Sequence, residues 1–172
     1  MGVDARHPVA GYDVGVRRRT RIGVWALGLG AGLWVLAILA APAAIDSPHP
    51  ALSFCATAVY AAGSNVCHQR PERSFHLAGH KMPVCARCTG LYASAALGVP
   101  LALFFAVAPP LSAGRARRML VLAALPTALT WGLEFAGVMT FGNAARALAA
   151  VPLGCVAAWL VVTQCRIERS DE

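Results

Sequence analysis

Long runs of residues without charge dominate the hydrophobic pattern of this chain. Residues 22–44, 89–108 and 147–165 contain no Asp, Glu, Lys or Arg, and residues 119–138 contain one charged residue, Glu134. Because an α-helix rises about 1.5 Å per residue, about 20 apolar residues are needed to cross the hydrocarbon of a bilayer. The pattern therefore predicts four membrane-spanning helices over these four ranges.

A fifth apolar segment, residues 51–66, is shorter and carries four polar side chains: Ser53, Thr57, Ser64 and Asn65. Its length lies between those of the known classes, so a thin span, a re-entrant helix and an interfacial helix stay open as alternatives. The pattern as a whole predicts an all-α fold. We expect a polytopic integral membrane helical bundle with four spans and one further short or re-entrant helix.

The composition favours lipid as the surroundings of this chain. Hydrophobic residues make up 58% of it and charged residues 13%, whereas soluble domains carry about 25% charged residues. The net charge of +7 then indicates anchoring at a membrane surface, because basic residues flank the cytoplasmic ends of spans. We therefore expect the lipid bilayer and no nucleic acid as a partner, and a multi-pass location in the cytoplasmic (inner) membrane.

Two charged tails flank the predicted membrane domain of residues 22–165. Residues 1–21 form a basic N-terminal tail with five arginines, and residues 166–172 form a charged C-terminal tail. The five arginines predict a cytoplasmic N-terminus. The side on which the Cys/His loop of residues 67–88 lies stays open, because it depends on whether residues 51–66 span the membrane.

Glycines in the first predicted span indicate a contact between helices. Gly28, Gly30 and Gly32 lie within residues 22–44. In lipid, small side chains allow two helix backbones to come close together. We therefore expect these three glycines to form a packing face.

The Cys/His loop holds the residues with metal-binding chemistry. Cys67, His68, Cys85 and Cys88 offer three thiolates and one imidazole, which complete a tetrahedral zinc shell. Such a site would bind zinc or iron and close a loop of about 20 residues, with a structural or sensing role. Because adjacent residues rarely bind one ion together, His80 is an alternative to His68.

Residues 67–75 read Cys-His-Gln-Arg-Pro-Glu-Arg-Ser-Phe, and residues 83–92 read Pro-Val-Cys-Ala-Arg-Cys-Thr-Gly-Leu-Tyr. These segments resemble the signature of a family of small predicted membrane proteins of bacteria and archaea, a domain of unknown function. The resemblance continues to about residue 150, where Pro126, Asn143 and Arg146 fit the family pattern. Thr130 and Glu134 depart from it, since they stand where the family shows Asp and Gln. The resemblance implies an architecture and candidate residues but no activity.

Thiol redox chemistry is the main alternative to a metal site, and it leaves enzymatic activity open. Cys85 and Cys88 form a C-x-x-C pair just before a predicted helix. The helix N-terminus and Arg87 would both stabilise a thiolate. The pair would then serve a membrane thiol-disulfide oxidoreductase. A third interpretation is a folded loop with inert or disulfide-bonded cysteines.

The polar residues Glu134, Asn143 and Arg146 form the second candidate site. A carboxylate inside a span needs a partner, and Arg146 follows the turn at Gly142-Asn143 closely enough to reach back. The pair is either a structural ion pair or part of a proton or ion path. The second alternative would make the protein a small transporter or channel component.

Overall fold

The computed structural model describes residues 10–105 and 111–167 and is helical apart from one short hairpin. This part contains five α-helices, namely α1 (Ala10–Ala44), α2 (Pro50–Val66), α3 (Ala86–Phe105), α4 (Ala113–Phe135) and α5 (Asn143–Ile167). The loop between α2 and α3 holds the 3-10 helix η1 (Pro71–Arg73) and the strands β1 (His76–Leu77) and β2 (His80–Lys81). The helix α1 begins at Ala10, so it includes much of the expected N-terminal tail.

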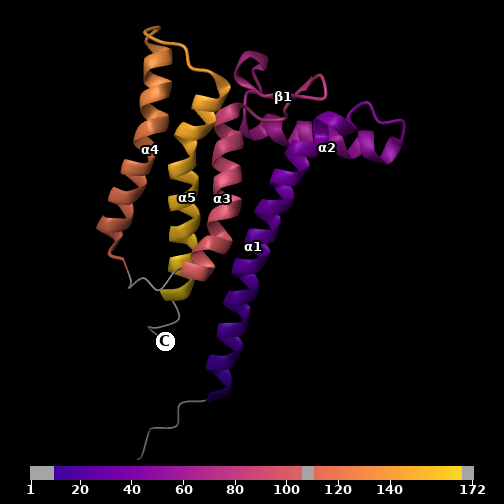
Figure 1. The fold of residues 1–172 in the computed structure, drawn as a ribbon. Coiled ribbons are helices and arrows are strands. Elements are labelled where there is room, and N and C mark those ends of the chain that lie inside the picture. Colours follow the sequence, from indigo (N-terminus) through magenta and orange to yellow (C-terminus); the bar gives the residue numbers. More distant parts are fainter. Residues whose placement is uncertain (1–9, 106–110, 168–172) are drawn as a thin grey trace, which may run out of the picture.

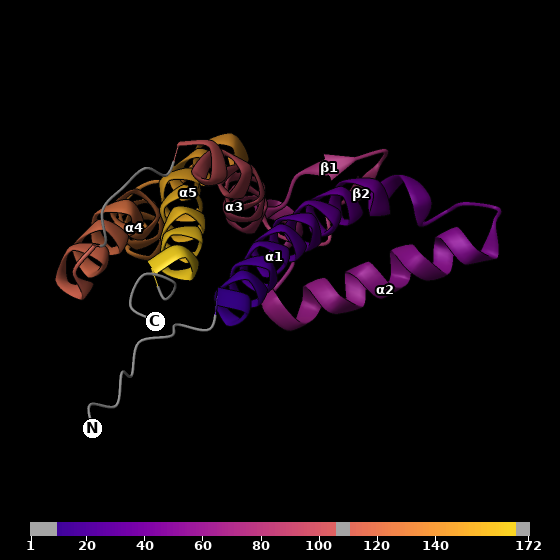
Figure 2. The same cartoon turned by 90° about the horizontal axis from the view of Figure 1, so that it is seen from below.

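Four of the helices run side by side, and α2 lies across one end of them (Figure 1). The helix α3 packs against α5 on one side and α1 on the other, while α4 packs against α5. Figure 2 shows the same order from below, with α1 beside α3 and α2 beside α1. The loop with η1, β1 and β2 lies at the end of the bundle where α1 ends and α3 begins (Figure 1).

The prediction of four spans is wrong. Among the residues that the structure describes, two helical segments are long and apolar enough to cross a membrane, Ile22–Ala44 in α1 and Asn143–Thr163 in α5. The helix α4 does not qualify, although 119–138 was a predicted span. Three arginines lie in its first two turns and Glu134 near its end, so only residues 119–133 are free of charge.

The predicted span 89–108 does not qualify either. The helix α3 has the charged Arg87 and the polar Thr89 in its first turn, and Gly, Ser and Pro further along. The last residues of the predicted range, 106–108, lie outside the described residues. The described part of this range is therefore shorter than the span that the sequence predicts.

The segment 51–66 forms α2, a helix of 17 residues. Only Ala56 and Gly63 of this helix are buried, and Phe54 is 75% exposed. Its orientation across the other helices (Figure 1) and its exposed apolar side chains are typical of an interfacial helix, the third of the alternatives.

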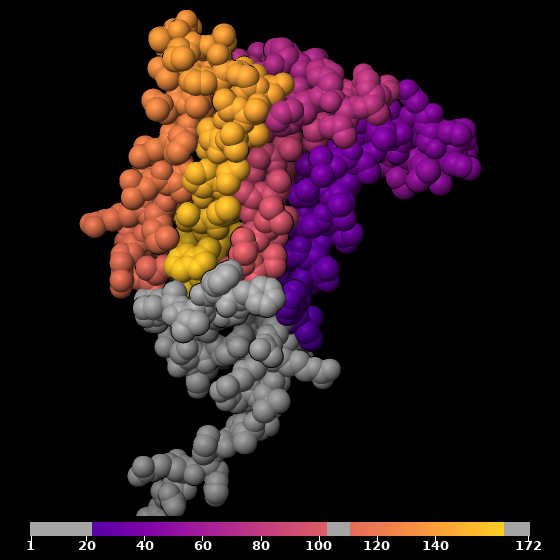
Figure 3. Space-filling model, viewed as in Figure 1, coloured from indigo at the N-terminus to yellow at the C-terminus, as the bar shows by residue number. Residues whose placement is uncertain are grey.

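The most extensive helix contact, between α3 and α5, depends on small residues. A Cβ on Gly90 would overlap the carbonyl oxygen of Ala147, and a Cβ on Gly154 would lie 2.5 Å from the carbonyl oxygen of Leu91. Relieving either overlap would require the two helices to move apart. In Figure 3, α5 lies between α4 and α3 on the visible face.

The glycines of the first predicted span contribute less than expected. A Cβ on Gly28 would lie 2.9 Å from Cγ1 of Val99 in α3, but a Cβ on Gly30 or Gly32 would meet nothing within 4 Å. The expected packing face is therefore limited to Gly28. Val24 and Val99 belong to a buried apolar cluster that joins α1, α3 and α5.

We predict that Gly90→Ala and Gly154→Ala each lower the free energy of unfolding by about 1–3 kcal/mol, because an added methyl group overpacks the interface. Thermal unfolding of the full chain in detergent, followed by tryptophan fluorescence, measures this loss. Gly30→Ala is the matched control, since its Cβ meets no atom within 4 Å. Equal melting temperatures for all three variants would contradict the close contact of α3 and α5.

Candidate functional site

Three of the four predicted metal ligands meet at the end of the bundle. Cys67 directly follows α2, Cys85 directly precedes α3, and Cys88 lies on the first turn of α3. Their sulfur atoms all lie within 4.8 Å of one another. All three cysteines are free thiols in this structure. This spacing allows the three sulfur atoms to bind one metal ion.

An apolar cluster surrounds the cysteines on the side of α1. Cys67 is 6% exposed and packs with Ile38, Met82 and Val84, which are buried completely or almost so. Cys85 and Cys88 pack against the same cluster. The backbone N–H of Cys85 donates a hydrogen bond of 3.2 Å to Sγ of Cys67. The sulfur atoms therefore have a dry, fixed environment on this side.

The loop between Cys67 and Cys85 is held by its own contacts. Nζ of Lys81 donates to the carbonyl oxygen of Gln69 at 2.9 Å, and the hydroxyl of Tyr60 donates to the carbonyl oxygen of Lys81. The hairpin turns at Ala78 and Gly79, which both have positive φ, 49° and 81°. That geometry matches a two-residue turn between antiparallel strands. These bonds bring the two ends of the loop, and so its cysteines, together.

The two predicted histidines lie away from the three sulfur atoms. His68 is exposed and is not a member of the cysteine cluster. Nε2 of His80 lies 2.8 Å from a carboxylate oxygen of Asp46, at the end of α1. The structure therefore assigns His80 a different partner and leaves His68 at the surface beside the site.

The three sulfur atoms affect one another's ionisation. A hydrogen bond from Cys88 lowers the pKa of Cys85 to about 5; burial opposes this, and hydrogen bonding with Cys67 supports it. The pKa of Cys88 is raised, first by its hydrogen bond to Cys85 and then by burial. The coupled cysteines therefore carry one negative charge between them. A bound cation would allow the remaining thiols to ionise.

Glu134 is the centre of a second, adjoining site. Its Oε2 accepts a hydrogen bond of 2.7 Å from Arg87, and its Oε1 accepts one of 2.7 Å from Nε of Arg146. The backbone N–H of Phe141 donates to Oε1 at 3.2 Å. The side chain of Glu134 is only 4% exposed. The structure thus brings Glu134 to Arg146, and adds Arg87 as a second partner.

Arg146 extends this network to the Cys/His loop. Its Nη1 donates to Oδ1 of Asn143 at 2.8 Å and to the carbonyl oxygen of Glu72 at 3.2 Å. Nδ2 of Asn143 donates to the carbonyl oxygen of Ser74 at 2.8 Å. The start of α5 therefore holds the turn η1 in place.

The ion pairs fix the charge of Glu134. Burial raises its pKa, but hydrogen bonds from Arg87 and Arg146 outweigh that effect and lower the pKa to about 2. Glu134 is therefore ionised at neutral pH and does not exchange protons there. Sequence reasoning missed the pairing of Arg87 with Glu134, because it assigned Arg87 to the thiolates. The clue to this pairing is the balance of charges, because a single buried carboxylate can pair with more than one arginine.

A pocket of about 170 Å³ lies between the two sites. Three groups of residues line it: the arginines, the two C-x-x-C cysteines, and His68 with Trp131. In full, they are His68, Arg70, Arg73, Cys85, Arg87, Cys88, Trp131 and Arg146. No pattern in the sequence predicts this pocket, because its arginines come from the loop, α3 and α5.

We predict that replacing Glu134 by Leu lowers the free energy of unfolding by about 3–5 kcal/mol, since it leaves two buried guanidinium groups without their counter-ion. The double variant with Arg146→Leu should lose less than the sum of the single losses. Denaturant unfolding of the detergent-solubilised chain measures the cycle. Strictly additive losses would contradict the network, and Arg118→Leu, at the exposed start of α4, is the control.

Comparison with known proteins identifies two archaeal relatives. An uncharacterized protein of Methanocaldococcus jannaschii is 52% identical over 48 residues, which cover 28% of this chain and 29% of that protein. An uncharacterized protein of Methanothermobacter thermautotrophicus is 33% identical over 90 residues, which cover 52% of this chain and 78% of that protein. No solved structure matches the chain.

The same comparison confirms the family resemblance. Residues 67–160 match a family whose description is a predicted membrane protein. The matched range includes the three clustered cysteines, Glu134 and Arg146. Because this range makes up more than half of the chain, the protein belongs to the family described as Predicted membrane protein (DUF2085).

Proposed function

We propose that the Cys/His loop is a metal-binding module of a multi-pass protein in the cytoplasmic membrane. The observation that carries this proposal is that the sulfur atoms of Cys67, Cys85 and Cys88 all lie within 4.8 Å of one another. Thiolates in such an arrangement suit zinc or iron. The backbone N–H of Cys85 donates to Sγ of Cys67, which holds that sulfur atom next to the start of α3.

The fourth ligand in this proposal is His68. Its side chain is exposed and lines the same pocket as Cys85 and Cys88. Because the extended backbone at Cys67 points it away from the sulfur atoms, His68 would have to rotate toward the metal to bind it. His80 is less suitable, because Asp46 already holds it. With four protein ligands the shell is closed, which favours a structural or sensing role over catalysis.

Metal binding explains how α2, the loop and α3 stay together at this end. The metal would join the end of α2, at Cys67, to the start of α3, at Cys85 and Cys88. Closing a loop of about 20 residues stabilises a fold by restricting the unfolded chain. Loss of the metal should therefore loosen α2 and the loop before it affects the contact between α3 and α5.

We predict about one zinc or iron per chain, bound by thiolates that alkylating reagents reach only after a chelator is added. Metal analysis of the purified protein measures this. Cys67→Ser, Cys85→Ser and Cys88→Ser should each lose the metal. His68→Ala should bind it more weakly, because the shell is left with three protein ligands.

Cys55→Ser and Cys155→Ser are the matched controls, because neither residue belongs to the sulfur cluster. Both variants should keep the metal in full. Metal-free protein in which Cys85 and Cys88 form a reversible disulfide would contradict the proposal and favour the redox alternative.

We further propose that α1 and α5 cross the membrane with both of their outer ends in the cytoplasm. The five arginines before Ile22 support this orientation. The end of α1, next to the Cys/His loop, would then lie on the outer side (Figure 1). The cysteines and the pocket would accordingly face the outside of the cell membrane.

We predict that a reporter fused before Arg17 and one fused after Ile167 are both active only in the cytoplasm. An impermeant maleimide should label Ala78→Cys, at the tip of the hairpin, in intact cells. The unsubstituted chain is the control for background labelling of its own cysteines. Reporter activity on the outer side at either terminus would refute this orientation.

A further inference from the structure

We propose that the pocket beside the cysteines binds a divalent oxyanion of the phosphate class. The ligand is either free inorganic phosphate or the phosphate headgroup of a lipid, which share this chemistry. The proposal rests on the arginines that line the pocket, and it does not depend on a metal ion at the cysteines.

The pocket has more positive charge than its own residues neutralise. Four arginines line it, Arg70, Arg73, Arg87 and Arg146. One carboxylate, that of Glu134, pairs with two of them, Arg87 and Arg146. In the part of the chain that the structure describes, Arg70 and Arg73 take part in no ion pair. The arginines therefore exceed the carboxylate by three charges, which attracts an anion with more than one negative charge.

The cysteines do not cancel this excess. A metal ion with two positive charges and three thiolates has a net charge of about −1. The excess of the arginines is larger than this charge, so the pocket stays positive by about two charges, which a divalent oxyanion neutralises.

Arg87 carries a polar atom that lacks a protein partner. Its side chain is 15% exposed, and Nη2 is bound to Glu134. Its Nε is buried and, among the described residues, has no hydrogen-bond partner. Buried N–H groups without a partner are costly and rare in native proteins. An oxyanion in the pocket that Arg87 lines offers acceptor atoms for such donors.

Two arginines of the pocket, Arg87 and Arg146, are held in place before a ligand binds. Arg146 is fixed by Glu134, Asn143 and the carbonyl oxygen of Glu72. The hydroxyl of Ser74 donates to the carbonyl oxygen of Arg70 at 2.9 Å, which stabilises the turn that carries Arg70 and Arg73. The guanidinium group of Arg146 is therefore pre-positioned for phosphate with little loss of side-chain entropy, and the turn fixes the backbone positions of Arg70 and Arg73.

The size of the pocket limits the ligand. Its volume is about 170 Å³, whereas sites for drug-sized molecules measure about 300–1,000 Å³. A tetrahedral oxyanion fits this space, but a nucleotide or a quinone does not. Trp131 lines the pocket and is 52% exposed. An exposed tryptophan beside a cationic pocket also suits a lipid headgroup, because tryptophan is favoured at membrane interfaces.

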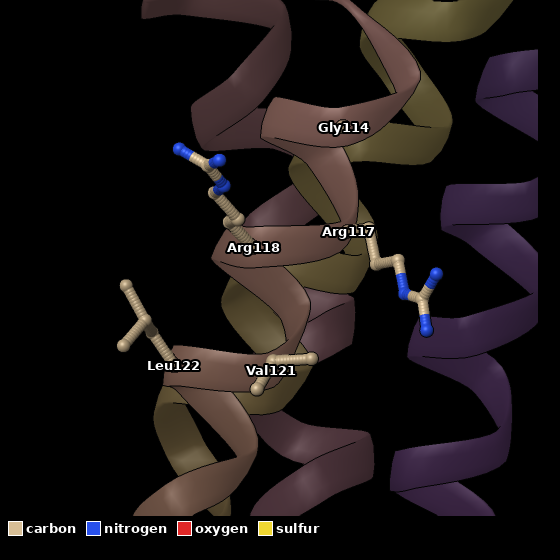
Figure 4. A pocket seen from close by; sticks show the side chains of 5 residues that line it. All are labelled: Gly114, Arg117, Arg118, Val121 and Leu122. Atoms are coloured by element: carbon tan, nitrogen blue, oxygen red, sulfur yellow. The ribbon is translucent and has the colours of Figure 1, made fainter.

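A second cationic region shows that charge alone does not make such a site. Gly114, Arg117, Arg118, Val121 and Leu122 line a cavity of about 480 Å³, but all five come from α4. Figure 4 shows that Arg117 and Arg118 point to different sides of this helix. Their guanidinium groups do not converge on one ligand. Arg118 is therefore a suitable control for arginines that do converge.

The test uses the full-length protein in nanodiscs of phosphatidylcholine, with inorganic phosphate as the soluble probe and phosphatidic acid added to the discs as the lipid probe. Binding is measured by calorimetry for phosphate and by thermal stability for both probes. We expect one of the two probes to bind. Arg70→Gln and Arg73→Gln should each weaken that binding by about tenfold or more, because each removes a charged hydrogen bond.

The variants are chosen so that folding and metal binding stay intact. Arg70 and Arg73 hold no ion pair in the described residues, unlike Arg87 and Arg146. Arg118→Gln should leave binding unchanged, and the metal content of all three variants should equal that of the unsubstituted chain. Binding of phosphate identifies a soluble ligand, and binding of phosphatidic acid alone identifies a lipid. Binding of neither probe, or equal weakening by Arg118→Gln, overturns the proposal.

Discussion

One buried carboxylate holds the polar end of this bundle together. Glu134 comes from α4, binds Arg87 of α3 and Arg146 of α5, and accepts a backbone N–H from the connection between α4 and α5. Removing a buried charge from water is costly, and only close opposite charges compensate for that cost. Three helices must therefore keep their positions at this end if Glu134 is to stay ionised.

The position of the cysteines follows from the same constraint. Arg87 lies between Cys85 and Cys88, so the ion pair that fixes Arg87 also fixes the first turn of α3. The loop then brings Cys67 to this turn, where the apolar cluster with Ile38 and Met82 encloses it. Packing and charge together bring three sulfur atoms close to one another and position four arginines next to them.

The sequence predicted the helices and the candidate cysteines better than it predicted the surroundings in which three of these cysteines cluster. Cys85 and Cys88 share one helical turn, so their spacing alone places them near each other. His68 differs, because the backbone at Cys67 is extended (φ −150°, ψ 138°) and adjacent side chains then point to opposite sides. The number of spans was overestimated, since the arginines at the start of α4 and Glu134 near its end leave only residues 119–133 free of charge. Arg70 and Arg73 join the pocket through tertiary contacts, which no local pattern encodes.

The close contact between α3 and α5 limits how this protein can change shape. Gly90 and Gly154 are each in close contact with backbone atoms of the opposite helix. Gly90 makes its contact near the start of α3, and Gly154 makes its contact farther along the helix pair. A sliding motion of one helix along the other would drive a carbonyl oxygen into a backbone that has no space for it. Any signal from a ligand at the cysteines must therefore travel by movement of the loop and α2, with α3 and α5 as the fixed frame.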